Sequence, residues 1–323
     1  MNRTPAISLV LTAHNEAAHI GRTLREIAAQ SGDFEVILVD DRSTDSTRDQ
    51  AQAAGIPGLR ILASTPDSTS ALTTRQQALD LGFRAARGAV IVTLDADSQL
   101  QPGWIEAMTR PILEGRVAMV AGPIAFAGRG WIAGWQNCDA AYYLLVSAIL
   151  SRLGLRSGAM FGNFAFRAAL YPQLGGFATL KPSLTEDLAF FRALQAAGHR
   201  HAFLGSRARV TVQACGGFHQ LVRRTLRITR APVSGLAVVL TLWPLTLLLA
   251  ALWAMLPAGG AEVLAWRYGA GVLVTGAGIL RNSAPRQLVF APIYEPIVFV
   301  IAAAAVVSRL RNPAIHWGGR RYD

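Results

Sequence analysis

Acidic and hydroxyl side chains stand at the ends of three apolar runs in the first hundred residues. Thr12 ends the run ISLVLT, Asp40 and Asp41 follow FEVILV, and Asp95 and Asp97 close the run VIVTLDAD. Because side chains alternate along a strand, Asp95 and Asp97 point to the same side if the strand stays extended. Two such carboxylates are oxygen ligands that Mg²⁺ or Mn²⁺ prefers, and a cation would join them to a phosphate. The alternative is a solvated turn whose acids cap the next helix.

A second acidic group lies in the middle of the chain. Thr185, Glu186 and Asp187 directly precede the run LAFFRALQAAG. This order is typical of a helix N-terminus, because a hydroxyl caps the backbone there and acids interact favourably with the helix dipole. Taken alone, the TED tripeptide is better explained by capping than by catalysis.

The elements that must position these residues alternate between strands and helices. This alternation predicts an α/β fold with a mostly parallel sheet. Ligands of such sheets bind at the carboxyl ends of the strands, which is where the polar residues stand. The expected strands are Ile7–Thr12, Phe34–Asp40, Leu59–Ala63 and AVIVTLDAD, and the expected helices include one over Ala71–Ala86.

The apolar residues are concentrated in the last third of a 323-residue chain that is 52% hydrophobic and only 16% charged. Ala231–Ala261 contains no charged residue, and a membrane-spanning helix needs roughly 20 apolar residues. Val263–Leu280 is a second apolar segment. The third, Leu288–Ser308, is interrupted by two prolines and by Glu295, and only about half the spanning length remains after Pro296. We therefore expect two membrane spans and a third segment that lies in the interface or re-enters.

Much of the positive charge also lies near the membrane segments. The net charge is +11, and Lys181 is the only lysine. Such a charge suits nucleic acid, anionic lipid or a phosphorylated small molecule. The chain has no nucleic-acid-binding motif, so we exclude that class, and HQLVRRTLRITR is typical of a basic amphipathic helix on anionic membrane lipids. The expected domains are residues 1–215, an interfacial helix at 216–232, a membrane region at 233–308 and a basic tail at 309–323.

Four motifs, TAHNE, VDDRSTD, LDAD and TED, resemble in order and spacing those of the family 2 glycosyltransferases with the GT-A fold. The resemblance implies that Thr12, Glu16 and Asp41 hold the nucleotide of a sugar donor, with Asp41 able to accept from a uracil N–H. It implies that Asp95 and Asp97 bind a divalent cation, Mg²⁺ or Mn²⁺, on the donor diphosphate. Asp95 is therefore expected to contact both the metal and the donor.

The same resemblance assigns roles to later residues. Asp187 would be the base that takes the proton of the acceptor hydroxyl, and Glu186 would orient the acceptor or the base. Arg75 would contact the diphosphate, with a solvated helix residue as an equal alternative. Asn163 would line the acceptor pocket, or would be a buried turn residue.

One motif departs from the family. Processive members carry Q-x-x-R-W before the membrane, and this chain has Gln220, Arg223 and then Arg224 in place of the tryptophan. Gln220 is expected to bind the acceptor and Arg223 to reach the diphosphate. A tryptophan would be a stacking surface for a growing glycan, so its absence predicts a non-processive enzyme.

Together these features predict an inverting, metal-dependent glycosyltransferase of the cell (inner) membrane, with its catalytic domain in the cytoplasm. The donor would be a nucleotide-sugar, expected to be UDP-linked, and the acceptor a hydroxyl of a membrane lipid. The tail PAIHWGGRRYD resembles that of bacterial ceramide-glucosyltransferase-like enzymes. Two alternatives stay open: a polyprenyl-phosphate glycosyltransferase, whose anionic acceptor needs no base, and a catalytically silent membrane scaffold or transporter component. The sugar, the lipid and the oligomeric state are not specified by the sequence.

Overall fold

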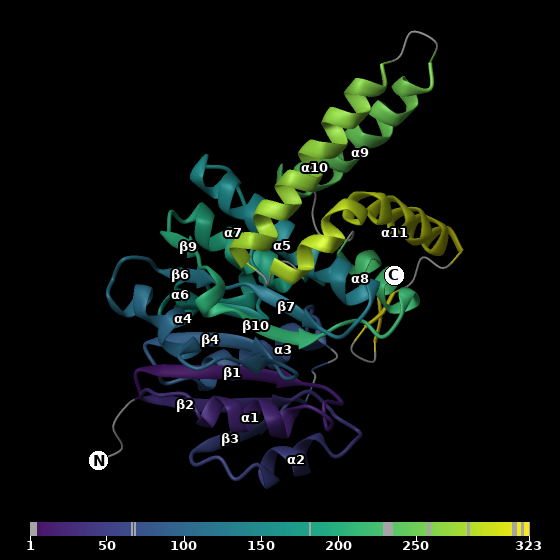
Figure 1. Cartoon of the computed structure of the whole chain (residues 1–323). Helices are drawn as coiled ribbons and strands as arrows, with labels where there is room; N and C mark the ends of the chain where they lie inside the picture. The colour runs from purple at the N-terminus through teal and green to yellow at the C-terminus, as the bar shows by residue number, and fades with distance from the viewer. Residues whose placement is uncertain are drawn as a thin grey trace. The chain divides into compact units, whose positions relative to one another are not determined.

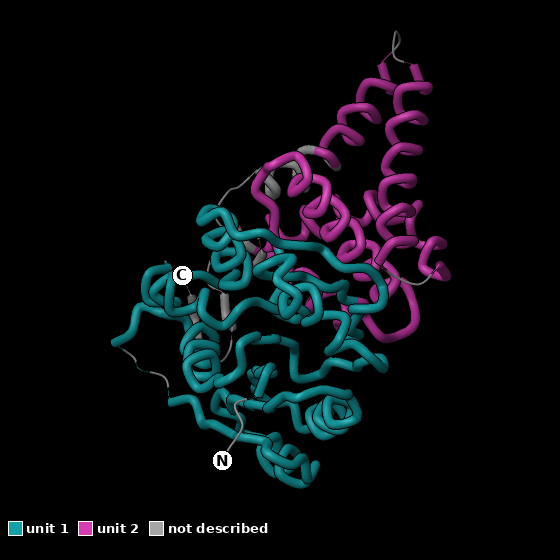
Figure 2. Tube along the Cα trace, turned by 90° about the vertical axis from the view of Figure 1, so that its left-hand side faces the viewer, with its two compact units in different colours: residues 1–124, 159–213, 317–320 teal, residues 125–158, 214–316, 321–323 magenta. Residues whose placement is uncertain are grey.

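The computed structural model describes residues 5–65, 67, 69–180, 182–228, 235–256, 260–282, 285–311, 315–317 and 320–322. The chain forms two compact units, coloured separately in Figure 2. Unit 1 comprises Met1–Ile124, Ala159–Gln213 and Trp317–Arg320, and unit 2 comprises Ala125–Gly158, Ala214–His316 and Arg321–Asp323. The units therefore differ from the contiguous division expected at residue 215, because the segment 125–158 belongs to unit 2.

Unit 1 is built on a seven-stranded sheet with the order β3-β2-β1-β4-β8-β6-β9. The first four of these strands are parallel neighbours, and β8 runs antiparallel to β4 and β6. The expected α/β fold with a mostly parallel sheet is therefore confirmed (Figure 1). The strands are β1 (Ile7–Ala13), β2 (Phe34–Asp40), β3 (Leu59–Ala63), β4 (Val90–Asp95), β6 (Met119–Ala121), β8 (Asn163–Arg167) and β9 (His201–Phe203).

The helices of unit 1 follow from local sequence signals. In α1 (Ile20–Ala28) one face of Ile20, Leu24 and Ile27 is fully buried, as expected of an amphipathic helix packed on a sheet. In α3 (Thr74–Ala85) Thr73 and Gln76 form a reciprocal capping box. The other helices are α2 (Thr47–Ala53), α4 (Trp104–Leu113), α6 (Leu170–Gln173), η1 (Gly176–Thr179), α7 (Glu186–Ala196) and η2 (Ser206–Ala208), and a short strand β5 (Gln99–Leu100) pairs antiparallel with β10 (Val210–Gln213).

An aromatic cluster fixes two helices that carry site residues. Phe83 on α3 and Phe190 on α7 each meet Phe166 of β8 edge to face, with ring centroids 5.3 and 5.0 Å apart. Phe166 and Phe190 are fully buried. Aromatic pairs in this geometry contribute stability beyond the burial of their area. The N-terminal ends of α3 and α7 are therefore held at fixed places on the same sheet.

Unit 2 is helical. Its long helix α5 (Trp131–Arg152) is largely buried and packs on α10, where a Cβ at Gly278 would lie 2.8 Å from the carbonyl oxygen of Ala141. Only glycine permits this approach, and the contact is one reason why α5 groups with the C-terminal helices. The remaining elements are β7 (Ile124–Ala127), at the boundary of the units, α8 (Phe218–Ile228), α9 (Gly235–Ala254), α10 (Ala261–Asn282), η3 (Pro285–Phe290), α11 (Ala291–Arg311), β11 (Ile315–Trp317) and β12 (Arg320–Tyr322).

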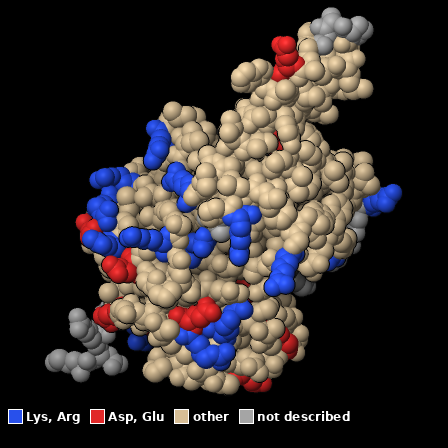
Figure 3. Space-filling model, viewed as in Figure 1, with Lys and Arg blue, Asp and Glu red and all other residues tan. Residues whose placement is uncertain are grey.

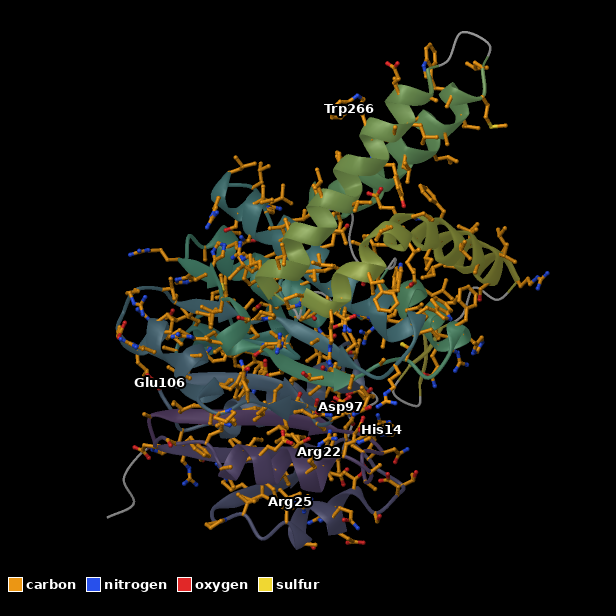
Figure 4. The ribbon with its side chains drawn as sticks, in the orientation of Figure 1. His14, Arg22, Arg25, Asp97, Glu106 and Trp266 are labelled. Carbon is orange, nitrogen blue, oxygen red and sulfur yellow. The ribbon has the colours of Figure 1, made fainter. Side chains whose placement is uncertain are left out.

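Two stretches among the described residues are helical, long and apolar enough to cross a membrane, Ala261–Asn282 and Pro285–Ser308. Only 28% of each is buried, whereas the core helix of a soluble protein is mostly buried. Large apolar side chains accordingly face outward, among them Trp266 at 81% exposed (Figure 4) and Leu273 at 74%. The hairpin of α9 and α10 carries almost no charge on the face seen in Figure 3. These properties agree with the expected membrane region, but the two candidate spans are the second and third apolar segments of the sequence. Among the described residues the first segment contributes a shorter apolar helix, Leu245–Ala254.

The expected break of the third apolar segment at Pro296 is wrong, because α11 continues through that residue. Proline has no N–H, so the carbonyl of Pro292 loses its helical partner, and the hydroxyl of Tyr268 on α10 donates to it at 2.8 Å. Glu295, 4% exposed, is paired with Arg267 of α10 at 3.0 Å. Side chains of α10 thus provide a hydrogen-bond donor for the carbonyl of Pro292 and a counter-ion for Glu295.

Candidate functional site

The strand ends predicted to carry the chemistry lie side by side. In the sheet, β1 is hydrogen-bonded to β2 on one side and to β4 on the other. The register places Thr12 opposite Asp95 of β4, and Ala13 opposite Asp40 of β2. Because all three strands are parallel, the loops that follow them emerge at the same edge.

The loops after β1 and β2 are joined by hydrogen bonds. Asn15 adopts a left-handed conformation, with φ of 58°. Its backbone N–H donates to the hydroxyl of Ser43 at 3.0 Å, and its side-chain oxygen accepts from the N–H of Thr44 at 2.8 Å. The N–H of Glu16 donates to the hydroxyl of Thr47 at 2.7 Å. The two loops are therefore held together as one rigid wall of the site.

The paired aspartates after β2 have different roles. The carboxylate of Asp40 accepts from the N–H of Ser43 at 3.1 Å, so it stabilises the turn. Asp41 is 6% exposed and its carboxylate is bound by Nε of Arg42 at 2.9 Å. Arg42 has φ of 60°, a conformation that non-glycine residues seldom adopt and that is often found at functional sites.

The two acids of the D-x-D motif are close together, but not for the reason expected. β4 ends at Asp95 and a turn follows, in which the N–H of Ser98 donates to the carbonyl of Asp95 at 3.1 Å. The extended conformation assumed from side-chain alternation is therefore wrong. Asp95 accepts from Arg75 at 3.2 Å, and Asp97 accepts from the N–H of Gln213 at 2.8 Å.

Negative charge accumulates beside this motif. Burial first, and then the charges of Asp97, Asp95 and Asp45, raise the pKa of Glu16 to about 7. The pKa of Asp97 is also raised, by burial and then by the charge of Asp95. Neighbouring carboxylates repel one another when all of them are ionised, and a divalent cation bound between them removes this repulsion.

The donor set fits a cation that is shared with a substrate. Among the described residues no three His, Cys, Asp or Glu side chains gather closely enough to hold a metal by themselves. Mg²⁺ is commonly held by one or two carboxylates together with substrate phosphates and water. Asp95 and Asp97 would be those carboxylates, and the phosphate oxygens would complete the site.

Arg75 is not a solvated helix residue. Its Nε donates to Glu186 at 2.7 Å and its terminal nitrogen to Asp95 at 3.2 Å, so it joins α3 to α7 and β4. Burial lowers the pKa of Arg75, but the charges of Glu186, Asp95 and Asp187 outweigh that effect and raise it. Glu186 is 5% exposed. The predicted residues Arg75, Asp95 and Glu186 thus form one ionic network.

Asp187 stands in the first turn of α7, where its carboxylate accepts from the N–H of Leu188 at 2.8 Å. The hydroxyl of Thr185 makes no capping hydrogen bond. Instead the N–H of Thr185 donates to Ser183 at 3.1 Å, and the N–H of Ser183 donates to the side chain of Gln76 at 3.3 Å. The TED motif is therefore tied to the first turn of α3, which simple capping does not require.

One predicted residue of unit 1, Asn163, takes no part in this network. Asn163 is fully buried, accepts from Trp104 at 3.1 Å and donates to the carbonyls of Pro123 and Ala208 at 2.8 and 2.7 Å, so it is the buried turn residue of the two alternatives. Gln220 and Arg223 belong to α8 in unit 2. Gln220 accepts from the N–H of Gly216 at 2.7 Å, and Arg223 is exposed.

Two residues that bear on the site were not identified from the sequence. A Cβ at Gly162 would lie 2.4 Å from a carboxylate oxygen of Asp95, so only glycine leaves room for that side chain. Gln76, fully buried, links α3 to the TED loop. The adjacency of Gln76 to Arg75 was the only available signal, and nothing in the sequence distinguishes Gly162 from an ordinary turn glycine.

Residues 8–174 match the model described as "Glycosyl transferase family 2". The chain is 31% identical over 122 residues to undecaprenyl-phosphate 4-deoxy-4-formamido-L-arabinose transferase of Aeromonas hydrophila, covering 36% of each chain. It is 33% identical over 109 residues to the succinoglycan biosynthesis protein ExoO of Rhizobium meliloti, covering 33% of this chain and 30% of the relative. The matched region is about a third of the length of such curated relatives.

Among solved structures, the mannosyltransferase PcManGT from Pyrobaculum calidifontis, in complex with GDP-Man and Mn²⁺, superposes with a TM-score of 0.59 at 20% identity. The match covers 94% of this chain and 88% of that one. A mycobacterial protein superposes with a TM-score of 0.50 at 20% identity, covering 70% of this chain and 72% of that one. These likenesses support the fold assigned to unit 1.

Proposed function

Because the chain belongs to glycosyl transferase family 2, we propose that it is an inverting, metal-dependent, non-processive glycosyltransferase. The donor is a nucleotide-sugar, expected to be UDP-linked, and the acceptor is a hydroxyl of a membrane lipid. The observation that carries the proposal is the acidic cluster of Glu16, Asp95 and Asp97 at the strand ends of unit 1, linked by Arg75 to the TED motif.

The donor occupies the edge formed by β1, β2 and β4. Thr12 and Asp41 stand at the ends of adjacent strands, and the carboxylate of Asp41, held by Arg42 at 2.9 Å, would turn to the base of the donor. A carboxylate in this position accepts a hydrogen bond from the N–H of a pyrimidine base, which favours uridine. Asp95 and Asp97 would hold a divalent cation, which would supply charge stabilisation for the departing nucleotide.

The base is Asp187. Its carboxylate takes the proton of the acceptor hydroxyl, the oxygen forms a bond to the anomeric carbon, and the bond from that carbon to the diphosphate breaks with its electron pair on the diphosphate oxygen. Glu186 is held by Arg75 at 2.7 Å and orients the acceptor or the base. Arg75 itself is fixed by Glu186 and Asp95, so its remaining donor can reach the diphosphate.

The lipid acceptor and the membrane location are proposed from unit 2. Its apolar helices face outward. The apolar residues Leu221 and Val222 of α8 are buried within the protein, and the exposed Arg223 on the same helix would meet anionic headgroups. Gln220 would bind the acceptor and Arg223 the diphosphate. Arg224 lies over the ring of Phe126 at 4.9 Å, where processive relatives have tryptophan. The catalytic unit would face the cytoplasm at the inner membrane.

The decisive test is binding followed by product analysis. Isothermal titration of the full chain in detergent with UDP, and with GDP as the comparison, should show binding that requires Mn²⁺ and is lost in Asp97→Asn. Mass spectrometry of lipids from cells with and without the gene should then reveal a missing glycolipid. Absence of metal-dependent nucleotide binding to the wild-type protein would instead support the silent scaffold or transporter component.

A second candidate is a polyprenyl-phosphate glycosyltransferase. It is favoured by the similarity to undecaprenyl-phosphate 4-deoxy-4-formamido-L-arabinose transferases of Aeromonas hydrophila and Pseudomonas paraeruginosa, at 31% identity for both. A phosphate acceptor is already anionic and needs no base. Asp187→Asn distinguishes the two: near-normal turnover favours the phosphate acceptor, and a loss of at least about 100-fold favours the hydroxyl acceptor.

A further inference from the structure

One face of α1 is bonded to the turn that carries the second acid of the D-x-D motif. Arg22, Thr23 and Glu26 of α1 all contact the backbone of residues 96–100, and Gln30, just after the helix, contacts the next residue. The spacing within α1 is helical, since Glu26 follows Thr23 by three positions and Arg22 by four, and such positions lie on neighbouring turns. The contacts therefore form a continuous row along the helix.

Thr23 is the centre of this row. It is fully buried, and its hydroxyl oxygen lies 2.8 Å from the carbonyl of Ala96 and 2.9 Å from that of Ser98. These two carbonyls flank Asp97 in the chain. A single hydroxyl proton shared between them fixes the backbone on both sides of the carboxylate-bearing residue.

Arg22 and Glu26 act on either side of Thr23. Arg22 donates to the carbonyl of Asp97 itself at 2.9 Å. The carboxylate of Glu26 accepts from the N–H of Leu100 at 2.6 Å. Both bonds involve an ionised group, which makes them stronger than bonds between neutral groups.

Gln30 closes the row. Its amide donates to the carbonyl of Gln101 at 3.1 Å, so the contacts of α1 and its C-terminal end extend from residue 96 to residue 101. β4 ends at Asp95, so the strand does not hold the next two residues, Ala96 and Asp97. The position of Asp97 relative to Asp95 is therefore set beyond the end of β4, where α1 holds the backbone of the turn and the N–H of Gln213 holds the carboxylate of Asp97.

We propose that α1 is the positioning element of the metal site, with Arg22 and Thr23 as positioning residues that act through the backbone of the D-x-D turn. This inference rests on the proposed metal-dependent function. The chemistry that it adds is preorganisation: the two carboxylates are set at the separation that the cation needs before the donor arrives. Partners that orient metal ligands typically contribute 10- to 100-fold to metal affinity.

The positioning effect of Arg22 on metal binding can be distinguished from the effect of its positive charge. The guanidinium of Arg22 is positive and close to Asp97, so on electrostatic grounds alone its removal would tighten the binding of a cation. Loss of positioning would weaken the binding. The two effects have opposite signs, and Arg25 on the same helix is an exposed arginine that provides a matched control.

The experiment compares Arg22→Met, Arg25→Met, Thr23→Val and Thr23→Ser in the full chain in detergent. Mn²⁺ binding in the presence of saturating UDP is measured by titration, and hydrogen–deuterium exchange of residues 95–101 is measured without metal. We expect about a 10-fold rise in the Kd for Mn²⁺ in Arg22→Met, with faster exchange in the turn, and no change in Arg25→Met. Thr23→Ser should retain wild-type binding, because it keeps the hydroxyl.

The outcomes separate this inference from the function on which it rests. If the wild-type chain binds no Mn²⁺ with UDP, the metal-dependent function fails. If the wild type binds and Arg22→Met binds equally well or more tightly, with unchanged exchange in the turn, the positioning role is overturned. Should Thr23→Val fail to fold, the comparison of Arg22→Met with Arg25→Met still decides the matter.

Discussion

The buried carboxyl of Glu16 makes a quantitative prediction about stability. Its pKa is raised from 4.5 to about 7 by burial and by the neighbouring charges of Asp97, Asp95 and Asp45. The native state therefore binds the Glu16 proton more tightly than the unfolded chain does. Stability contributed by this group is fully present below pH 4.5 and is lost as the pH rises through 7.

The size of the effect follows from the shift. One pKa unit corresponds to about 1.4 kcal/mol, so the full shift would amount to about 3.4 kcal/mol. Glu16 is only partly buried, and solvent screening reduces this to about 1 to 2 kcal/mol. Glu16→Gln cannot ionise, so above pH 8 the variant should be more stable than the wild type by this amount, or by about 4 °C in Tm.

Thermal unfolding of the full chain in detergent, followed by tryptophan fluorescence with EDTA present, checks this prediction between pH 5 and pH 8.5. The difference in Tm between Glu16→Gln and the wild type should be small at pH 5 and largest at pH 8.5. Glu106→Gln is the control, because the side chain of Glu106 is 72% exposed. Parallel profiles for wild type and Glu16→Gln would refute the reasoning, and so would a variant that is less stable at pH 8.5.

Three further substitutions test other contacts. Gly162→Ala places a methyl group 2.4 Å from a carboxylate oxygen of the D-x-D motif. In titrations with UDP present, this change should raise the Kd for Mn²⁺ by about 10-fold. An unchanged Kd would contradict the close contact. Arg75→Met leaves Glu186 buried without its partner and should lower the free energy of unfolding by about 2 to 3 kcal/mol. Adding Glu186→Gln in the same chain should restore a large part of this loss. A double variant no more stable than Arg75→Met would argue against the ion pair. Arg267→Leu should lower the free energy of unfolding by about 3 to 5 kcal/mol, because it leaves Glu295 without its partner. Adding Glu295→Gln should restore part of this loss. Thermal unfolding of the single and double variants measures the loss and the rescue.

The sheet and its polar edge could be predicted from the sequence because both depend on local patterns. The buried runs of β1, β2 and β4 are continuous in apolar residues, as strands covered on both faces must be. The acids follow those runs directly, so a parallel arrangement brings them to one edge. Glu16 and Arg75 were placed at the site by the resemblance to the family.

The remaining features depend on contacts between distant segments. β8 inserts antiparallel between β4 and β6, and α5 joins unit 2 through the close approach at Gly278, neither of which has a local signal. The turn after Asp95 overrides side-chain alternation because α1 binds its backbone. Similarly Pro296 interrupts no helix, because its lost partner is replaced by Tyr268 from another helix.

The partners of α11 also determine an order of folding. Glu295 and the carbonyl of Pro292 are satisfied by Arg267 and Tyr268, both on α10. Until α10 is in place, α11 holds a carboxylate without its counter-ion and a carbonyl without a donor, and both are costly to remove from water. Since α10 is synthesised first, its side chains are already available when α11 leaves the ribosome. A chain in which these two segments were exchanged would have the same composition and the same hydropathy, and yet would have to insert the dependent helix before the one that stabilises it.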